Sequence, residues 1–131
     1  MTTRTTAALM TVPLAAIVAL ALGGGGAGAS EVHAATTTRT LSADPNGDLA
    51  FTKTRLTAKH GVVKLVMTNP SSSGLEHGIA IAVRGPDKRG NIVDPGGTSR
   101  VRARLKRGRY TYYCPVPGHR AAGMRGRLVV K

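Results

Sequence analysis

From residue 35 onward, short apolar segments alternate with turn signals that recur about every ten residues. Residues 44–47 (DPNG), 69–74 (NPSSSG) and 94–97 (DPGG) are the clearest of these turns. The 17 glycines of the chain agree with so many turns, because glycine adopts turn conformations that other residues avoid. Segments this short bury their apolar side chains by pairing into sheets. The pattern therefore predicts an all-β sandwich or barrel of about seven short strands.

The predicted strands lie between these turns. Their ranges are 36–42, 62–68, 77–83, 100–105, 109–114 and 125–130, with one more strand beginning at 49–51. In two of the strands, alternation of side chains is clear enough to assign the faces. The side chains predicted to face the core are Val63, Leu65, Met67, Val101, Ala103 and Leu105. Arg100, Arg102 and Arg104 are predicted to face outward.

The first 34 residues have the character of a secretory signal. Arg4 precedes an apolar run over residues 7–22, and a glycine stretch follows. Small residues then form two candidate cleavage sites, which end at Ala29 and Ala34. These features predict that the rest of the chain is exported to the periplasm, the cell surface or the medium.

A retained membrane anchor is the alternative interpretation of this segment. The run is short for a membrane span, and Pro13 weakens it as a helix. We therefore predict a signal peptide and linker at residues 1–34 and a single domain at residues 35–131.

Cys114 is the only cysteine, so the domain has no internal disulfide. A free thiol in an exported protein is prone to oxidation unless something occupies it. His119 follows five positions later in a predicted loop, and Met124 five positions after that, where the last strand begins. His77 opens a predicted strand and offers a fourth ligand. A thiolate, two imidazoles and a weakly bound thioether are the ligand set of a blue-copper centre.

Each of these residues also has a purely structural interpretation. Cys114 could be an inert buried thiol, Met124 could fill the core, and His77 could be a buried histidine with satisfied hydrogen bonds. The gathering of a thiol, an imidazole and a thioether within eleven residues favours the metal. His60 lies in a predicted turn and is interpreted as a solvated side chain.

Three segments of the sequence resemble the cupredoxins, the type 1 blue-copper proteins. Residues 114–126 (CPVPGHRAAGMRG) resemble the ligand loop of that family, and residues 108–113 resemble the strand that leads into it. The segment that carries the first histidine in that family is similar to residues 67–70 (MTNP) and 77–81 (HGIAI). The Cys-x4-His-x4-Met spacing is closest to the sulfocyanin, auracyanin and rusticyanin members.

The resemblance implies a Greek-key β-sandwich and one copper ion per chain. It implies that His77, Cys114, His119 and Met124 are the copper ligands. Many cupredoxins have asparagine after the first histidine, where its side chain ties that segment to the cysteine loop. This chain has Gly78 there, so that contact is predicted to be missing or replaced.

The function implied is that of a secreted blue-copper protein that carries single electrons while copper cycles between Cu(I) and Cu(II). An extracytoplasmic copper-binding or copper-delivery protein is the alternative. A delivery site is expected to be richer in methionine, and the chain has only 4, two of them in the predicted signal segment. The sequence shows no paired carboxylates and no further histidine cluster, so we do not expect an enzyme.

The chain is strongly basic, with 19 Lys and Arg against 6 Asp and Glu and a net charge of +13. A run of cations such as that at residues 100–109 is typical of a solvated face, and it also suits an acidic redox partner protein, or contact with an anionic cell surface or membrane. Nucleic acid is not expected, because the domain is predicted to be exported and no aromatic residues are interleaved with the cations. Arg120 follows His119 directly and would bias docking toward acidic partners. We expect a monomer.

Overall fold

The structure is a computed structural model that describes residues 35–131, and the predicted signal segment at residues 1–34 lies outside the described residues. The described residues form eight strands and one short 3-10 helix, η1. Their bounds are β1 (Thr37–Ser42), β2 (Arg55–Ala58), β3 (Gly61–Thr68), η1 (Ser71–Ser73), β4 (Ala80–Ala82), β5 (Lys88–Arg89), β6 (Thr98–Leu105), β7 (Gly108–Tyr113) and β8 (Arg125–Val130). Within this part of the chain, no helix has the length and apolar character needed to span a membrane.

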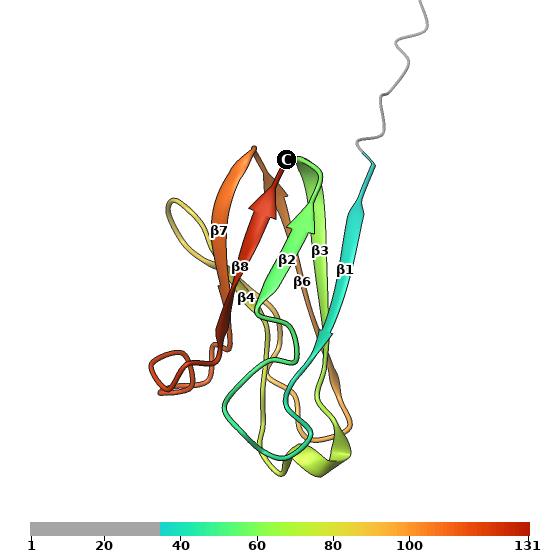
Figure 1. Cartoon of the computed structure of the whole chain (residues 1–131), viewed down its shortest axis with the longest axis vertical. Coiled ribbons are helices and arrows are strands. Elements are labelled where there is room, and N and C mark those ends of the chain that lie inside the picture. The colour runs from blue at the N-terminus through green and yellow to red at the C-terminus, as the bar shows by residue number, and fades with distance from the viewer. Residues whose placement is uncertain (1–34) are drawn as a thin grey trace, which may run out of the picture. The chain divides into compact units, whose positions relative to one another are not determined.

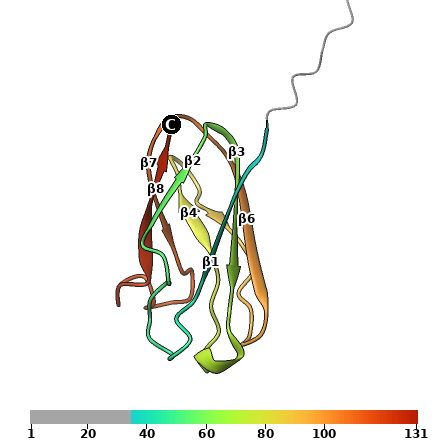
Figure 2. The same cartoon turned by 45° about the vertical axis from the view of Figure 1, so that its right-hand side comes forward.

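The strands form two sheets that lie face to face (Figures 1 and 2). One sheet has the order β1-β3-β6, and the other has the order β2-β8-β7-β4-β5. The β1–β3 and β2–β8 pairs are parallel, and the other neighbouring strands are antiparallel. Consecutive strands repeatedly change sheets, as in a Greek-key sandwich. The predicted all-β Greek-key sandwich is confirmed, with eight strands instead of about seven.

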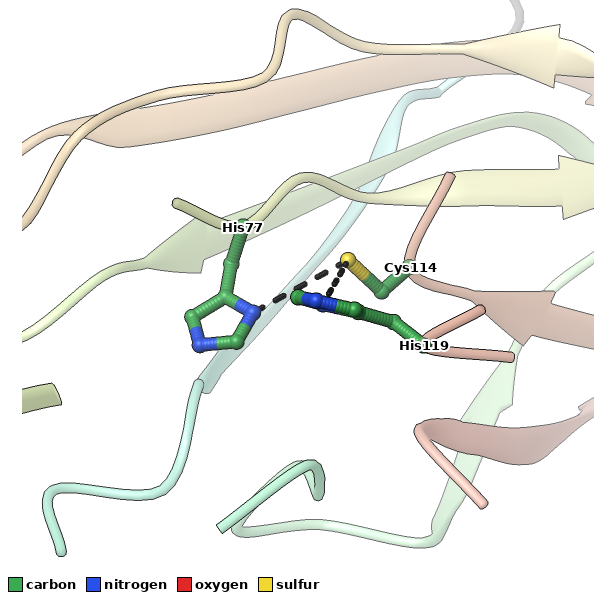
Figure 3. Close-up of side chains that lie close together, drawn as sticks. All are labelled: His77, Cys114 and His119. Atoms are coloured by element: carbon green, nitrogen blue, oxygen red, sulfur yellow. Dashed lines mark hydrogen bonds between the residues drawn. The ribbon is translucent and has the colours of Figure 1, made fainter. Parts of the chain in front are cut away.

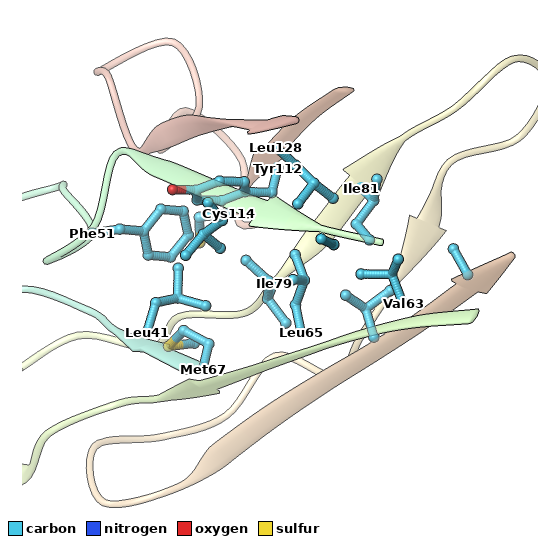
Figure 4. Close-up of a cluster of buried hydrophobic side chains, with 14 of the residues drawn as sticks. Leu41, Phe51, Val63, Leu65, Met67, Ile79, Ile81, Tyr112, Cys114 and Leu128 are labelled. Atoms are coloured by element: carbon cyan, nitrogen blue, oxygen red, sulfur yellow. The ribbon is translucent and has the colours of Figure 1, made fainter. Parts of the chain in front are cut away.

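The core lies between the two sheets (Figure 4). All six side chains that the alternation predicted to face inward are buried: Val63, Leu65, Met67, Val101, Ala103 and Leu105. The facing sheet contributes Ile81, Tyr112 and Leu128, which have no exposed surface. Alternation works here because successive side chains of a strand point to opposite faces of the sheet. Every member of the core cluster lies between Leu41 and Val130, so the domain contains its own core.

The two ends of the sandwich differ in construction. At one end, which we call the turn end, the β2–β3 and β6–β7 turns lie beside the last residues of β8. Gly61 pairs with Leu105, Gly108 pairs with Val130, and the amide of His60 donates to the carbonyl of Lys131 at 2.8 Å. At the opposite end, the loop end, lie the connections at residues 43–54, 69–79, 90–97 and 114–124.

The prediction that a strand begins at residues 49–51 is wrong. Hydrogen bonds from Asp44 N to Ala50 O and from Ala50 N to Asp48 O fold this segment into a compact loop. Only a single bridge forms there, between Ala43 and Phe51. The ring of Phe51 packs in the core, which accounts for the apolar residue at this position of the loop. The next strand along the chain is β2.

The strand predicted at residues 77–83 is shorter in the structure and covers only Ala80–Ala82. His77 forms an isolated bridge with Val93 instead. Lys88 and Arg89 form a two-residue edge strand that the turn-rich sequence around them did not predict.

Candidate metal centre

The loop between β7 and β8 carries three of the four predicted ligands. Cys114 directly follows β7, and its amide donates to the carbonyl of Met124 at 3.0 Å. The amide of Met124 donates in turn to the carbonyl of His119 at 3.0 Å, and the amide of His119 donates to Val116 O at 3.1 Å. These bonds fix the backbone at all three predicted ligand positions of the loop.

His77 is held by a different set of loops. Its amide donates to Val93 O at 3.1 Å, and its carbonyl accepts from Val93 N at 2.8 Å. The side chain of Asn69, which has no exposed surface, donates to Leu75 O at 2.8 Å and to Val93 O at 3.0 Å. Ser73 Oγ donates to Asn69 Oδ1 at 2.6 Å. Asn69 therefore ties together the segments on both sides of the His77 bridge.

The structure brings His77, Cys114 and His119 together at the loop end (Figure 3). The sulfur of Cys114 lies 3.9 Å from Nδ1 of His77 and 3.6 Å from Nδ1 of His119. Their ligand atoms all lie within 4.8 Å of one another. Bonds of about 2.3 Å from a metal to thiolate and 2.0 Å to imidazole, 120° apart, would separate sulfur and nitrogen by about 3.7 Å. The observed spacing fits a trigonal metal site.

Burial shifts the pKa of two of these groups. It raises the pKa of the Cys114 thiol, while the backbone amides of Gly78 and Val116 act in the opposite direction. The pKa of His77 is lowered, first by burial and then by the proximity of His119. A neutral imidazole is the form that binds a metal. Nε2 of His77 is buried without a hydrogen-bond partner in the described residues, so packing orients that side of the ring.

Gly78 contacts the cysteine directly through its backbone. Its amide donates to the sulfur of Cys114 at 3.4 Å. A Cβ at this position would lie 3.0 Å from Asn91 O and 3.1 Å from Cγ of Pro115. Gly78 has no side chain to contact the cysteine segment, so its contacts there are the amide–sulfur hydrogen bond and the close packing of Pro115 on its backbone.

Met124 lies beside this cluster in the chain and is fully buried. Its backbone hydrogen bonds to Cys114 and His119 hold it at the base of the ligand loop. Its side chain belongs to the core cluster that also contains Cys114. The structure thus unites three of the predicted ligands around one point and ties the fourth, Met124, to two of them through the backbone.

Further residues that support the site were not identified from the sequence. Ser99 is fully buried; its hydroxyl accepts from Ile79 N at 3.2 Å and donates to Asn91 O at 2.5 Å. Asn69 also supports the segment around His77, through its side-chain hydrogen bonds to Leu75 O and Val93 O. Ser99 could have been identified because it is a polar residue at an otherwise buried position of a strand. Such residues usually have a hydrogen-bonding partner.

A polar cluster adjoins the ligand loop on its outer side. The hydroxyl of Tyr113 donates to Asp87 Oδ2 at 2.5 Å, and Val83 N donates to Asp87 Oδ1 at 3.3 Å. The guanidinium of Arg120 lies 4.2 Å from the centre of the Tyr113 ring. This cation–π contact and the tyrosine–carboxylate bond connect the ligand loop to the β4–β5 connection.

Comparison with known proteins agrees with this geometry. A sequence profile described as copper binding proteins, plastocyanin/azurin family, matches residues 37–131. The chain belongs to this family of cupredoxins. No curated protein sequence matches the chain.

Several solved structures are similar to this cupredoxin. Auracyanin B is similar to it, with 26% identity and a TM-score of 0.65, over 75% of this chain and 90% of that one. A dithionite-reduced auracyanin from Roseiflexus castenholzii shares 23% identity and a TM-score of 0.61, over 75% and 98% of the two chains. The copper nitrite reductase of Nitrosomonas europaea shares the fold, with 21% identity and a TM-score of 0.60, over 74% of this chain and 42% of the enzyme.

The donor chemistry of the site identifies copper as the metal of this cupredoxin. One cysteine sulfur and two imidazoles whose spacing fits a trigonal site, near a methionine, suit copper better than a hard cation such as magnesium or calcium. Among residues 35–131, His77, Cys114 and His119 are the only group of three or more histidine, cysteine or acidic side chains that could hold a metal.

Proposed function

We propose that this cupredoxin carries single electrons between redox partners outside the cytoplasm, with one copper ion bound by His77, Cys114, His119 and Met124. The convergence of one sulfur and two imidazole nitrogens within 4.8 Å supports this function. Bound copper would supply a one-electron couple between Cu(I) and Cu(II). The remaining properties of the site come from the chain itself.

The chain keeps water away from most of the site and limits its movement. His77, Cys114 and Met124 have no exposed surface. Hydrogen bonds fix the backbone at each of these residues, and Gly78 donates to the sulfur. A frame of this kind can hold similar ligand positions in both oxidation states, so that little has to reorganise when an electron is transferred.

His119 is the proposed port for the electron, because it is the one half-buried member of the three-residue cluster. Leu75 and Ile92, each 44% exposed, lie within two residues of the His77–Val93 bridge in the chain. These exposed apolar side chains suit transient docking of a partner protein at the loop end. Arg120 adds a positive charge next to the port, and for this reason we propose an acidic partner and a monomeric carrier.

Copper delivery is the second candidate function, and burial of the site disfavours it. A donor that hands copper to another protein needs ligands that an acceptor can reach, whereas Cys114 and His77 are covered. The nitrite reductase likeness extends to the fold alone. We propose that this chain is a carrier and not an enzyme, that residues 1–34 direct its export, and that residues 35–131 form the functional domain.

Voltammetry of the copper-loaded protein tests the carrier function. We expect a reversible wave of one electron per chain, with copper retained over repeated cycles because the ligands stay in place. A competing Cu(I) chelator provides the comparison with delivery. Rapid loss of copper to the chelator after each reduction, with no reversible wave, would contradict the carrier and favour delivery.

A further inference from the structure

Acidic and basic side chains are distributed unequally between the two ends of the domain. Four of the five carboxylate side chains in residues 35–131 lie on loops of the loop end: Asp44, Asp48, Glu76 and Asp94. The fifth, Asp87, lies on the β4–β5 connection and is bound to Tyr113. Within the described residues, the turn end carries no aspartate or glutamate.

Cations gather at and around the turn end. They come from the β2–β3 turn, the β6–β7 hairpin and the end of β8, which the strand register brings to one end of the sandwich. Arg84, on the β4–β5 connection, lines one groove with Arg104 and Lys106. All of them are exposed: Lys59, Arg84, Arg104, Lys106, Arg107, Arg109 and Lys131. We call this set the basic cap. Apart from Asp87, which follows Arg84 by three residues and is bound to Tyr113, the carboxylate side chains of residues 35–131 lie at the loop end, so the seven cations produce a strongly positive local potential.

The basic cap includes a groove of about 430 Å³. Its lining residues are Val83, Arg84, Arg104, Leu105, Lys106 and Tyr110. Tyr110 is held there by a hydrogen bond from its hydroxyl to Lys106 O at 2.9 Å. Three cations therefore surround a small apolar surface formed by the half-buried side chains of Val83 and Tyr110, next to the buried Leu105. This combination suits a molecule with an anionic head and an apolar body.

We propose that the basic cap docks on an anionic phospholipid surface, with headgroup phosphates on the cations and the groove receiving part of a lipid. Lysine and arginine near a membrane attract anionic lipids, and the attraction adds up over several side chains. The groove favours lipid over a nucleic acid or other soluble polyanion, because such a ligand has no use for the apolar lining beside Arg84, Arg104 and Lys106.

The path of the chain supports the same choice. β1 begins at Thr37, which pairs with Val63, two residues after the Gly61–Leu105 pair of the turn end. The chain therefore enters the described domain near the basic cap. The apolar run at residues 7–22 precedes this point in the sequence. If that run is retained, it adds a second membrane signal to the chain.

Docking through the basic cap would leave the loop end free. The ligand loop between β7 and β8, which carries His119 in the sequence, lies at the end opposite the β6–β7 turn (Figure 1). A carrier that rests on a membrane in this orientation presents its electron port to partners. This consequence depends on the proposed electron transfer, but the lipid binding does not.

Vesicle sedimentation tests the proposal with the full chain. The vesicles contain phosphatidylcholine alone or phosphatidylcholine with about 30% phosphatidylglycerol, a fraction of the order that gives an appreciable surface potential. The test variant replaces three cap residues: Arg104→Gln, Lys106→Gln and Arg107→Gln. The control variant removes the same number of charges from the five-stranded sheet nearer the loop end: Arg55→Gln, Arg125→Gln and Arg127→Gln. Denaturant unfolding of each variant, which needs no copper, reports that the fold is intact.

We expect the wild type and the control to prefer the anionic vesicles at low salt and to lose the preference at high salt. The test variant should bind the anionic vesicles roughly a hundredfold more weakly than the wild type. The apolar run at residues 7–22 can contribute to binding of both vesicle types. The difference in affinity between anionic and neutral vesicles therefore reports the contribution of the basic cap. The same titration with residues 35–131, which contain the whole described core, removes the run altogether.

Two results would overturn the proposal. If the test and control variants weaken equally, the binding reflects net charge and not the basic cap. If the wild type binds soluble heparin but shows no preference for anionic vesicles, the cap recognises a soluble polyanion instead of lipid. Vesicle binding is measured independently of copper, so a failure of lipid docking is distinct from a failure of electron transfer.

Discussion

Met124 and Met67 are both fully buried, yet only Met124 is hydrogen-bonded through its backbone to Cys114 and His119. Met67 lies on β3 and packs in the core. Leucine has a similar volume, so either Met→Leu change should cost less than about 1.5 kcal/mol of stability. The two methionines therefore form a matched pair for testing the axial ligand.

We predict that Met124→Leu raises the reduction potential and alters the visible spectrum of the copper-loaded protein, whereas Met67→Leu changes neither. The reason is that a weak sulfur donor to the metal is lost only in the first variant, and the axial ligand tunes the potential. Voltammetry and absorbance check this directly. Equal behaviour of the two variants would mean that Met124 is core filler.

Gly78 is predicted to be intolerant of a side chain. Gly78→Ala places a Cβ 3.0 Å from Asn91 O and 3.1 Å from Pro115 Cγ, which should cost about 1–3 kcal/mol of unfolding free energy. The displaced backbone would also weaken the amide–sulfur bond and change the absorbance of the copper-loaded protein. Denaturant unfolding and spectra measure the two effects.

The control for this prediction is Gly85→Asn. No heavy atom lies within 4 Å of a Cβ built at Gly85, and its φ is +88°, a region that asparagine tolerates better than most residues. An unchanged spectrum and stability in Gly78→Ala would show that the close approach of Pro115 has no consequence.

At the level of single residues, the sequence identified the candidate ligands because their chemistry is distinctive. Cys114, His119 and Met124 lie within one loop, and His77 opens a short apolar segment. The contribution of Gly78 could not be predicted, because the approach of Pro115 depends on how two distant loops pack. The sequence showed only that the usual asparagine was absent.

The connection between β4 and β5 is fastened to β7 by Asp87 and Tyr113. The hydrogen bond from Tyr113 is the main cause that lowers the pKa of Asp87 below its ordinary value of 3.8. We predict that Asp87→Asn lowers stability at neutral pH by about 1 kcal/mol, since Asp87 is partly exposed and the bond is weakened by solvent.

The effect of Asp87→Asn should depend on pH in a defined direction. A carboxylate whose pKa is lower in the folded state stabilises the fold above its unfolded pKa and loses that contribution as pH falls through the folded pKa. The difference in stability between wild type and variant should therefore be constant above pH 4.5 or so and shrink below about pH 4. Unfolding experiments at several pH values measure it, and a difference that grows on acidification would contradict the assignment.

Secondary-structure elements were predictable where alternation was regular. β3, β6 and β8 lie close to their predicted ranges, because each has an apolar face that only one register can bury. The strand predicted around Phe51 was wrong, since one buried apolar residue in a loop gives the same sequence pattern as the start of a strand. β5 has only two residues and no apolar face, so its pairing with β4 left no periodic signal.

At the scale of the whole domain, the sequence predicted an all-β sandwich with a ligand loop, and the structure places that loop at one end of the sandwich. The unequal distribution of charge between the ends was not apparent, although the net charge of +13 was. Strand register decides which residues share an end, and it brings Lys59 beside the β6–β7 hairpin although the two are far apart in the chain.

Docking at the loop end gives a prediction for the intact molecule. Arg120→Glu should slow electron transfer to an acidic partner protein several-fold at low salt, because it reverses a charge next to His119, and the effect should fade at high salt. Arg102→Glu makes the same change of net charge at an exposed site on β6, in the other sheet, and serves as the control. Stopped-flow rates that are equal for the two variants would show that Arg120 has no special role in docking.

The most direct test of the copper centre is the visible spectrum of the purified protein after addition of one equivalent of Cu(II), with Cys114→Ala measured in parallel. We predict an intense blue absorption from thiolate bound to copper, which ascorbate bleaches and which the variant lacks. A colourless protein, or a band that persists in Cys114→Ala, would contradict a blue-copper centre formed by His77, Cys114, His119 and Met124.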